Sequence, residues 1–181
     1  MRRLVYLGVL VVLALATAPA WAEAIAEPSG YRLDNYKAPT PTTLHGAKVV
    51  TTSEAHALWQ AKGAIFIDVV SHPPKPADLP AGTIWRDPPH DTVSGAVWLP
   101  DVGRGVLAPA TEDYLKRSLA SLTGGDMDKP LLFFCKKDCW MSWNAAKRAL
   151  SYGYHRIYWY SDGVDGWKAA TLPLETIKPH P

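Results

Sequence analysis

The sequence predicts an α/β fold in which a central parallel sheet is flanked by helices on both faces. Residues 64–69 and 131–134 are short and almost continuously apolar, which is typical of strands buried on both faces of a parallel sheet. Segments with helical patterning alternate with these strands, and that alternation favours a parallel arrangement. With 181 residues, the chain has the length of one such domain.

The first three elements are expected to be a strand, a helix and a second strand. Residues 47–50 have the composition of a short strand. Thr51 offers a side-chain cap, and Glu54 a first-turn acid, for a helix over residues 51–61. Residues 64–69 then form the first of the two buried strands.

A long proline-rich segment, residues 70–94, interrupts the alternation and is expected to be a loop. Loops of this length are uncommon inside compact domains and often carry function. A short strand over residues 96–99 follows. The next helix is expected over residues 111–122, with Thr111 as its N-cap and Gly124 just beyond its end.

The last part of the chain repeats the strand and helix pattern twice. The strand over residues 131–134 leads into Cys135, and the helix that follows is expected to end at Tyr152. Residues 157–160 are a further strand, and residues 162–170 end as a terminal helix. Sites in parallel α/β sheets form outside the carboxyl ends of the strands, and Cys135 lies at such an end.

The N-terminus has the pattern of a secretory signal peptide over residues 1–22. Arg2 and Arg3 precede an apolar run over residues 4–16, and small residues at 20 and 22 suit cleavage after Ala22. The run is too short for a membrane span, which needs roughly 20 apolar residues. We therefore expect an exported protein with no membrane span after cleavage.

Composition divides the rest of the chain into three parts. Residues 23–43 are rich in Pro, Ala and Thr without any period, and are expected to form an extended N-terminal arm. Residues 44–175 form the domain, and residues 176–181 a C-terminal tail. Removal of two arginines with the signal peptide leaves 17 of the 19 basic residues against 17 acidic ones, so nothing indicates nucleic acid as a partner.

The two cysteines of the chain lie four residues apart, between a strand and a helix. At that place Cys135 and Cys139 face unpaired backbone N–H groups and the positive end of a helix dipole, which favour thiolate over thiol. Lys136 and Lys137 would lower a thiol pKa further and attract anions, although they could equally form a solvated turn. The spacing suits a thiolate that attacks and a second thiol that resolves the product as a disulfide.

Three other roles for the pair stay open at this point. The cysteines could form a structural disulfide, although so short a loop gives little entropic stabilisation. They could also be inert. Paired thiolates suit cuprous copper, with Met141 or His90 as a third ligand, whereas zinc would lack half of its ligands. Covalent haem is excluded, because Trp140 stands where a histidine would follow the second cysteine.

Two further side chains are candidates for supporting roles. Asp68, at the end of a buried strand, could organise the loop by accepting hydrogen bonds from the backbone or from Arg86 or Arg104; otherwise it is an ordinary strand-end carboxylate. Trp140, in the loop itself, could line the mouth of the site or meet a partner. Three other tryptophans are expected in the core: Trp143, Trp159 and Trp167.

In this order, the elements resemble a rhodanese domain over residues 44–175. The resemblance rests on Ile65-Phe66-Ile67-Asp68-Val69, then Ser94-Gly95-Ala96-Val97-Trp98-Leu99-Pro100, the cysteine loop, and Asp162-Gly163-Val164-Asp165-Gly166-Trp167-Lys168-Ala169-Ala170. It implies that Cys135 is the sulfur-accepting nucleophile of a six-residue loop that ends at Trp140. Active loops of this family usually end in a basic residue, and this one does not.

A narrower family is also similar, the PQQ-dependent catabolism-associated CXXCW motif proteins of the periplasm. The matching pieces are Tyr36-Lys37-Ala38-Pro39, Trp98-Leu99-Pro100-Asp101-Val102-Gly103 and Cys139-Trp140-Met141-Ser142-Trp143-Asn144-Ala145-Ala146-Lys147-Arg148. This resemblance implies a periplasmic location and a link to alcohol oxidation by quinoprotein dehydrogenases. The spacing here reads Cys-x3-Cys-Trp.

Together, residues and resemblance imply two hypotheses. In the first, Cys135 is the nucleophile or persulfide carrier and Cys139 the resolving thiol, with Lys136, Lys137 and Asp138 shaping the loop. Its partner is a small thiol or sulfur donor, and no resident cofactor is expected besides persulfide sulfur. In the second, the same loop and Trp140 form a binding module for a quinoprotein dehydrogenase, its cytochrome or a copper ion, without turnover.

Overall fold

The computed structural model describes residues 25–86 and 88–181, so the expected signal peptide lies outside the described residues. Five parallel strands form the central sheet in the order β1-β6-β5-β2-β4. Their bounds are β1 Ala47–Val49, β2 Ile65–Asp68, β4 Val97–Trp98, β5 Leu131–Phe134 and β6 Ile157–Tyr160. This is the predicted α/β arrangement, and the sheet places the ends of β2 and β5 side by side.

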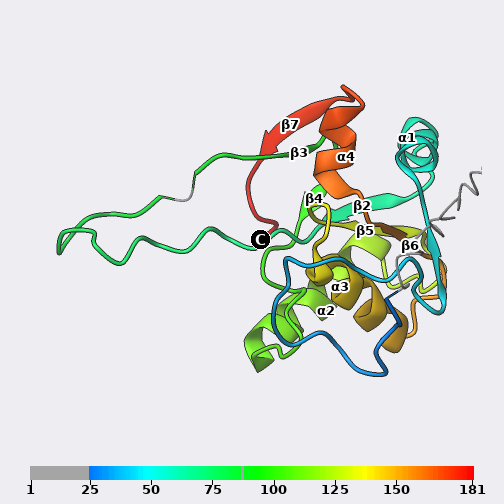
Figure 1. Cartoon of the computed structure of the whole chain (residues 1–181), viewed down its shortest axis with the longest axis horizontal. Helices are drawn as coiled ribbons and strands as arrows, with labels where there is room; N and C mark the ends of the chain where they lie inside the picture. The colour runs from blue at the N-terminus through cyan, green and yellow to red at the C-terminus, as the bar shows by residue number, and fades with distance from the viewer. Residues whose placement is uncertain (1–24, 87) are drawn as a thin grey trace, which may run out of the picture.

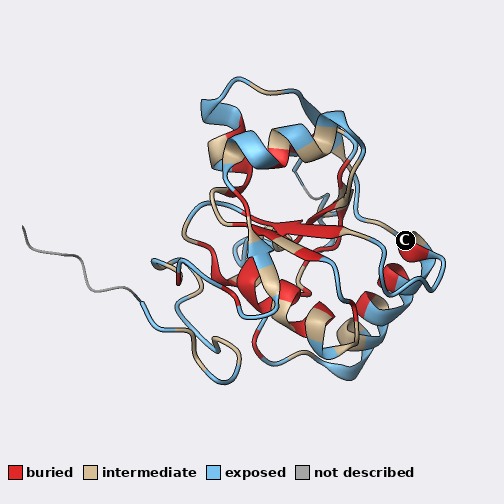
Figure 2. Ribbon diagram, turned by 90° about the vertical axis from the view of Figure 1, so that its right-hand side faces the viewer, coloured by how far each residue is buried: buried red, intermediate tan, exposed pale blue. Residues whose placement is uncertain are grey.

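Two helices cover each face of the sheet (Figure 1). The four helices are α1 Thr52–Gln60, α2 Pro109–Thr123, α3 Trp140–Ser151 and α4 Gly163–Ala169. The alternating side chains of β5 explain the layers: Leu131 and Phe133 pack towards α2 and α3, whereas Leu132 and Phe134 pack towards α1 and α4. Figure 2 shows the buried residues concentrated in the sheet and on the inward faces of the helices.

The helices begin largely where the sequence indicates. Thr51 caps α1 and Glu54 lies in its first turn, as predicted, and the two residues also form a capping box. The prediction of Thr111 as the cap of the next helix is wrong, because α2 begins two residues earlier at Pro109. A proline suits that first position, since its fixed φ is helical and it has no N–H to leave unpaired.

A second, two-stranded sheet was not predicted. β3 His90–Val93 pairs antiparallel with β7 Leu174–Ile177, so the end of the proline-rich segment is a strand rather than a loop. β7 also runs across the expected boundary between domain and tail at residue 175. The rest of the proline-rich segment leaves the end of β2, projects from the body of the domain and returns to β3 (Figure 1).

Residues 25–43, the described part of the N-terminal arm, form no helix or strand and pack on the domain. Figure 1 shows the arm crossing α3. Asn144, fully buried on α3, accepts a hydrogen bond from the backbone N–H of Arg32 and donates to the carbonyl oxygens of Arg32 and Gly103. Leu44, at the end of the arm, joins the hydrophobic core. Within residues 25–86 and 88–181, no helix is both long enough and apolar enough to cross a bilayer.

Candidate functional site

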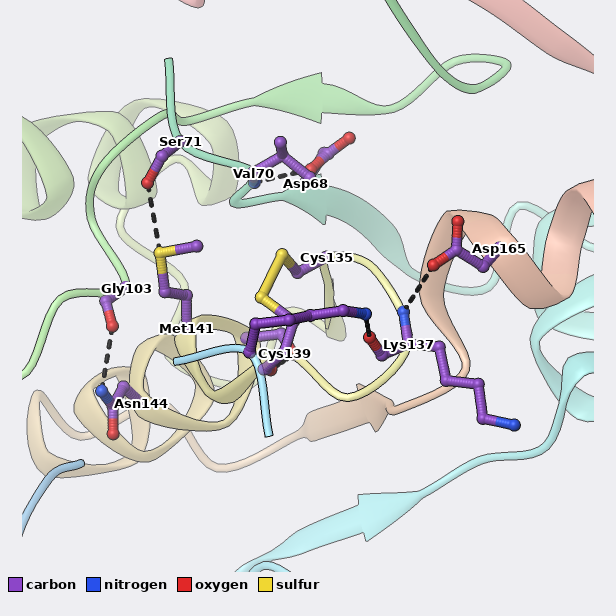
Figure 3. Close-up of a disulfide and its surroundings, with 12 residues drawn as sticks. Asp68, Val70, Ser71, Gly103, Cys135, Lys137, Cys139, Met141, Asn144 and Asp165 are labelled. Atoms are coloured by element: carbon purple, nitrogen blue, oxygen red, sulfur yellow. Dashed lines mark hydrogen bonds between the residues drawn. A yellow bond between two sulfur atoms is a disulfide. The ribbon is translucent and has the colours of Figure 1, made fainter. Parts of the chain in front are cut away.

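The cysteine loop leaves the end of β5 and enters α3 within five residues. Cys135 directly follows the strand, and Cys139 is the N-cap residue of α3. Their Cα atoms are 6.2 Å apart and their sulfur atoms form a disulfide (Figure 3). The sequence prediction that the two side chains meet is therefore confirmed by the geometry, and the pair is in its oxidised form.

The loop is held from one side by the first turn of α4. The backbone N–H of Val164 donates to the carbonyl oxygen of Cys135 at 2.8 Å, and that of Lys137 donates to the Asp165 carboxylate at 3.0 Å. Gly163 has a φ of 56° and lies so close to this loop that a Cβ there would collide with the carbonyl group of Cys135. The glycine is needed both for its conformation and for this close approach.

The N-terminal arm holds the loop from the other side. The N–H of Ala38 donates to the carbonyl oxygen of Asp138 at 3.0 Å, and Lys37 Nζ donates to that of Lys137 at 2.6 Å. Asp138 has a φ of 54°, a left-handed conformation that Asp tolerates better than most residues. This turn directs Cys139 back towards Cys135.

Both cysteines lie on the wall of one cavity of about 450 Å³ at the carboxyl edge of the sheet. Apolar and aromatic groups make up much of the remaining wall, namely Tyr36, Val70, Pro73, Pro74, Pro88, Pro89 and Trp98. The polar contributors include His72, His90, Lys37 and Lys136. The cysteines themselves are only 2 % and 6 % exposed, so a reactant reaches them through this cavity.

Asp68 accepts a hydrogen bond from the backbone, as predicted, but its side-chain donors are not the predicted arginines. The carboxylate is fully buried and accepts hydrogen bonds from His90 Nε2 at 2.8 Å, Thr92 Oγ1 at 2.5 Å and the N–H of Val70 at 2.8 Å. Arg104 instead donates to Asp101 at 3.5 Å. The supporting role predicted for Arg104 through Asp68 is therefore wrong. The side-chain donors to that carboxylate are His90 and Thr92, which β3 brings beside it.

Sequence reasoning considered His90 only as a copper ligand and missed its place beside Asp68. The imidazole stacks on Trp98 with ring centroids 4.1 Å apart, and it lines the cavity that holds the cysteines. The only sequence signal is that His90 directly follows the last proline of the proline-rich segment, Pro89. Its pairing with β7, more than eighty residues away, fixes its position.

Trp140 does not lie at the mouth of the site. It is the first residue of α3 and is 3 % exposed, its Nε1–H donates to the carbonyl oxygen of Pro39 at 3.0 Å, and its ring packs edge-on against Trp143. The prediction that it meets a partner is wrong, because the N-terminal arm covers it. Trp143, Trp159 and Trp167 are fully buried, as predicted.

The two lysines of the loop differ in their orientation. Lys136 lines the cavity, whereas Figure 3 shows the side chain of Lys137 extending away from the disulfide. Among the described residues that line the cavity, the lysines are Lys136 and, from the arm, Lys37. Across the part of the chain that the structure describes, no three His, Cys, Asp or Glu side chains gather in a metal-binding arrangement.

A cysteine loop at the carboxyl edge of a five-stranded parallel sheet, with two helices on each face, defines an α/β protein with a disulfide at that edge. The family model of the rhodanese-like domain matches residues 51–170. The chain therefore belongs to the rhodanese-like domain family, as the resemblance in its sequence indicates.

Several solved structures are similar to parts of this chain. Thiosulfate sulfurtransferase from Pseudomonas aeruginosa is 17 % identical with a TM-score of 0.50, over 74 % of this chain and 21 % of that one. The polysulfide-sulfur transferase homodimer from Wolinella succinogenes is 22 % identical with a TM-score of 0.44, over 73 % and 79 %. A protein from Anabaena is 15 % identical with a TM-score of 0.48, over 71 % and 80 %. No curated protein matches the chain.

Proposed function

We propose that this chain is an exported, periplasmic rhodanese-like protein whose Cys135–Cys139 pair cycles between dithiol and disulfide during sulfur transfer or thiol oxidation. The observation that carries the proposal is the disulfide on the wall of a cavity at the carboxyl edge of the sheet. A purely structural disulfide needs no cavity, and one that closes so short a loop stabilises the fold little.

The reaction begins with the reduced pair. The Cys135 thiolate attacks the terminal sulfur of a donor persulfide, so that an S–S bond forms on Cys135 and the donor leaves as a thiolate. The Cys139 thiolate then attacks Cys135 Sγ, which forms the Cys135–Cys139 disulfide and expels the transferred sulfur as hydrosulfide. The two thiols supply the two electrons, and an external dithiol reductant restores them.

Several contacts support this division of roles. Cys135 has the position of the nucleophile in the rhodanese resemblance, and Cys139 is already within bonding distance of it. A resolving thiol at that place explains why the loop ends in Trp140 rather than in a basic residue that would hold an anionic product. Lys136 and Lys37 beside the cavity favour an anionic reactant, such as a small persulfide as sulfur donor or a thiolate as reductant of the disulfide.

The link to PQQ-dependent alcohol oxidation rests on the narrower resemblance. Its three matching pieces come together at the site, because residues 36–38 bond the cysteine loop and Gly103 accepts a hydrogen bond from Asn144 on α3. We propose a periplasmic quinoprotein dehydrogenase, or its cytochrome, as the system that the protein serves. Docking through Trp140 is not part of this proposal, since that side chain is buried.

The test is a thiol titration over graded redox potentials, combined with persulfide trapping by alkylation and mass spectrometry. The wild-type protein should show one reversible two-electron couple. Cys139→Ser should accumulate a sulfur adduct on Cys135 when a persulfide donor is added, because the second step is blocked. Cys135→Ser is the matched control and should gain none. A pair that stays oxidised at every potential, or an adduct on Cys139 alone, would contradict the proposal.

A further inference from the structure

Three sulfur atoms, rather than two, lie on the wall of the same cavity. Met141 lines it together with Cys135 and Cys139. The methionine belongs to the first turn of α3, two residues after Cys139, and Figure 3 shows its thioether on the side of the disulfide, with the terminal methyl directed towards the cysteine sulfurs. We propose that the reduced pair and Met141 form a three-sulfur binding site for cuprous copper.

Opening the disulfide leaves the two thiols where they can share one ion. The loop is held by backbone hydrogen bonds to Val164 and Ala38, none of which involves a sulfur atom. The Cα atoms, 6.2 Å apart, therefore keep their separation after reduction. Two thiolates that have just lost their S–S bond can move apart by side-chain rotation alone and leave room for a metal ion between them.

The thioether can reach the same ion by a local rotation. Ser71 Oγ donates to Met141 Sδ at 3.1 Å, which occupies one of its two lone pairs and fixes the sulfur beside the cavity. Rotation about the Cγ–Sδ bond to the next staggered position moves the methyl group away from the cysteines and puts one lone pair in its place, while the other lone pair then faces Ser71. Methionine side chains adapt readily in this way.

The ligand chemistry selects cuprous copper among common metal ions. Thiolates and thioethers are soft ligands, which Cu(I) prefers, and Cu(I) does not demand four of them. Zinc would need further nitrogen or oxygen ligands. His72 and His90 also line the cavity, but within the described residues neither imidazole gathers with the two cysteines in a metal-binding arrangement. Lys136 offsets the net negative charge of a copper ion held by two thiolates.

The inference goes beyond the proposed function, because it needs only the dithiol form of the pair and no sulfur transfer. The same two sulfur atoms either bind copper or form the disulfide. Copper binding and oxidation of the pair are therefore mutually exclusive, so that bound Cu(I) should protect the dithiol from oxidation. The burial of both cysteines, at 2 % and 6 % exposure, shields the ion from solvent.

The experiment is an anaerobic competition between the chemically reduced protein and bicinchoninate for Cu(I), followed by the absorbance of the bicinchoninate complex. Reduced wild-type protein should remove one equivalent of copper, and the oxidised protein none. Cys135→Ser and Cys139→Ser should abolish the competition. Met141→Leu should weaken the affinity by about tenfold, the equivalent of one weak ligand. Met127→Leu, at an exposed methionine outside the cavity, should match the wild type.

Three results would overturn this site. The reduced protein could fail to compete, or the oxidised protein could take up as much copper as the reduced one. Met141→Leu could behave as Met127→Leu does, with His90→Gln weakening the affinity instead; the third ligand would then be an imidazole. Because the protein is reduced chemically before the titration, none of these results depends on whether the pair turns over sulfur.

Discussion

Asp68 is the residue whose environment differs most from what its place at the end of a strand suggests. A strand-end carboxylate would ordinarily reach solvent, but this one is fully buried and accepts three hydrogen bonds. Its donors come from two places, the backbone two residues on and the side chains of β3. The carboxylate thereby joins the central sheet to the β3–β7 pair and holds the His90 ring at the cavity.

Asp68→Asn should destabilise the protein by about 2 to 3 kcal/mol. Asparagine would place an NH₂ group where a carboxylate oxygen now accepts hydrogen bonds from His90 and Thr92, so both donors would lose their acceptor. Urea unfolding measures the change. Asp91→Asn, at the exposed neighbour of His90 on β3, is the control and should stay within about 0.5 kcal/mol of the wild type. Equal effects of the two substitutions would show that Asp68 does not organise this region.

Asp101 gives the stability of the protein a dependence on pH. Burial raises the pKa of this carboxyl, but the hydrogen bond with His72 and the charge of Arg104 outweigh that effect, so that its pKa lies below the usual value. A carboxylate with a lowered folded-state pKa adds stability above its unfolded pKa, and that stability is lost as pH falls through the folded value.

Asp101→Asn should therefore cost about 0.5 to 1 kcal/mol at pH 6, a small amount because solvent screens this partly exposed group. Asparagine keeps the backbone unstrained at a φ of 64°, so the charge alone changes. The difference from the wild type, measured by urea unfolding, should shrink towards pH 3. A difference that stays constant between these pH values would rule out the carboxylate as its source.

At the scale of elements, the cysteine loop is set by what packs against it rather than by its own residues. The first turn of α4 bonds it on one side, and the N-terminal arm bonds it on the other. The loop residues themselves are two exposed lysines and an aspartate in a left-handed conformation. The close approach of Gly163 to Cys135 is the contact that a single methyl group tests most directly.

Gly163→Ala should be much more destabilising than Gly124→Ala. Both glycines have positive φ, 56° and 66°, but a Cβ at Gly124 meets nothing within 4 Å, whereas one at Gly163 collides with the Cys135 carbonyl group. The conformational strain alone should cost about 1 kcal/mol at Gly124. Overpacking should add about 1 to 3 kcal/mol at Gly163. Urea unfolding of both variants measures the loss of stability. Equal losses for the two substitutions would contradict the close contact between Gly163 and Cys135.

The whole molecule places three segments distant in sequence around one cavity. The arm contributes Tyr36 and Lys37, the proline-rich segment contributes both of its ends, and the β5–α3 loop contributes the cysteines. The fold beneath them depends on the two hydrophobic layers on either side of the sheet, not on the disulfide. Redox cycling is therefore compatible with a stable fold.

Reduction of Cys135–Cys139 should leave the protein folded and lower its stability by at most about 2 kcal/mol, since the loop that it closes holds only five residues. Circular dichroism and urea unfolding of the oxidised and reduced forms measure this. The Cys135→Ser, Cys139→Ser double variant is the matched control for the reduced form. Loss of cooperative unfolding on reduction would mean that the disulfide is structural and would weaken the redox proposal.

The sequence by itself determined the parallel α/β architecture and the position of the cysteine loop. Apolar runs such as residues 131–134 and helix signals such as Thr51 with Glu54 are local, so they can be read without knowing what they contact. Sites in parallel α/β sheets form at the carboxyl ends of the strands, and this rule placed Cys135 at the site.

Only the tertiary structure decided which groups surround the sulfur atoms. The arm buries Trp140, β3 brings His90 to Asp68, and the first turn of α3 presents Met141 to the cavity. Each of these contacts joins surfaces whose meeting depends on how the layers pack, and for Trp140 the partner is about a hundred residues away. Local patterns fix periodicity and burial, whereas the pairing of distant segments depends on the free energy of the complete fold.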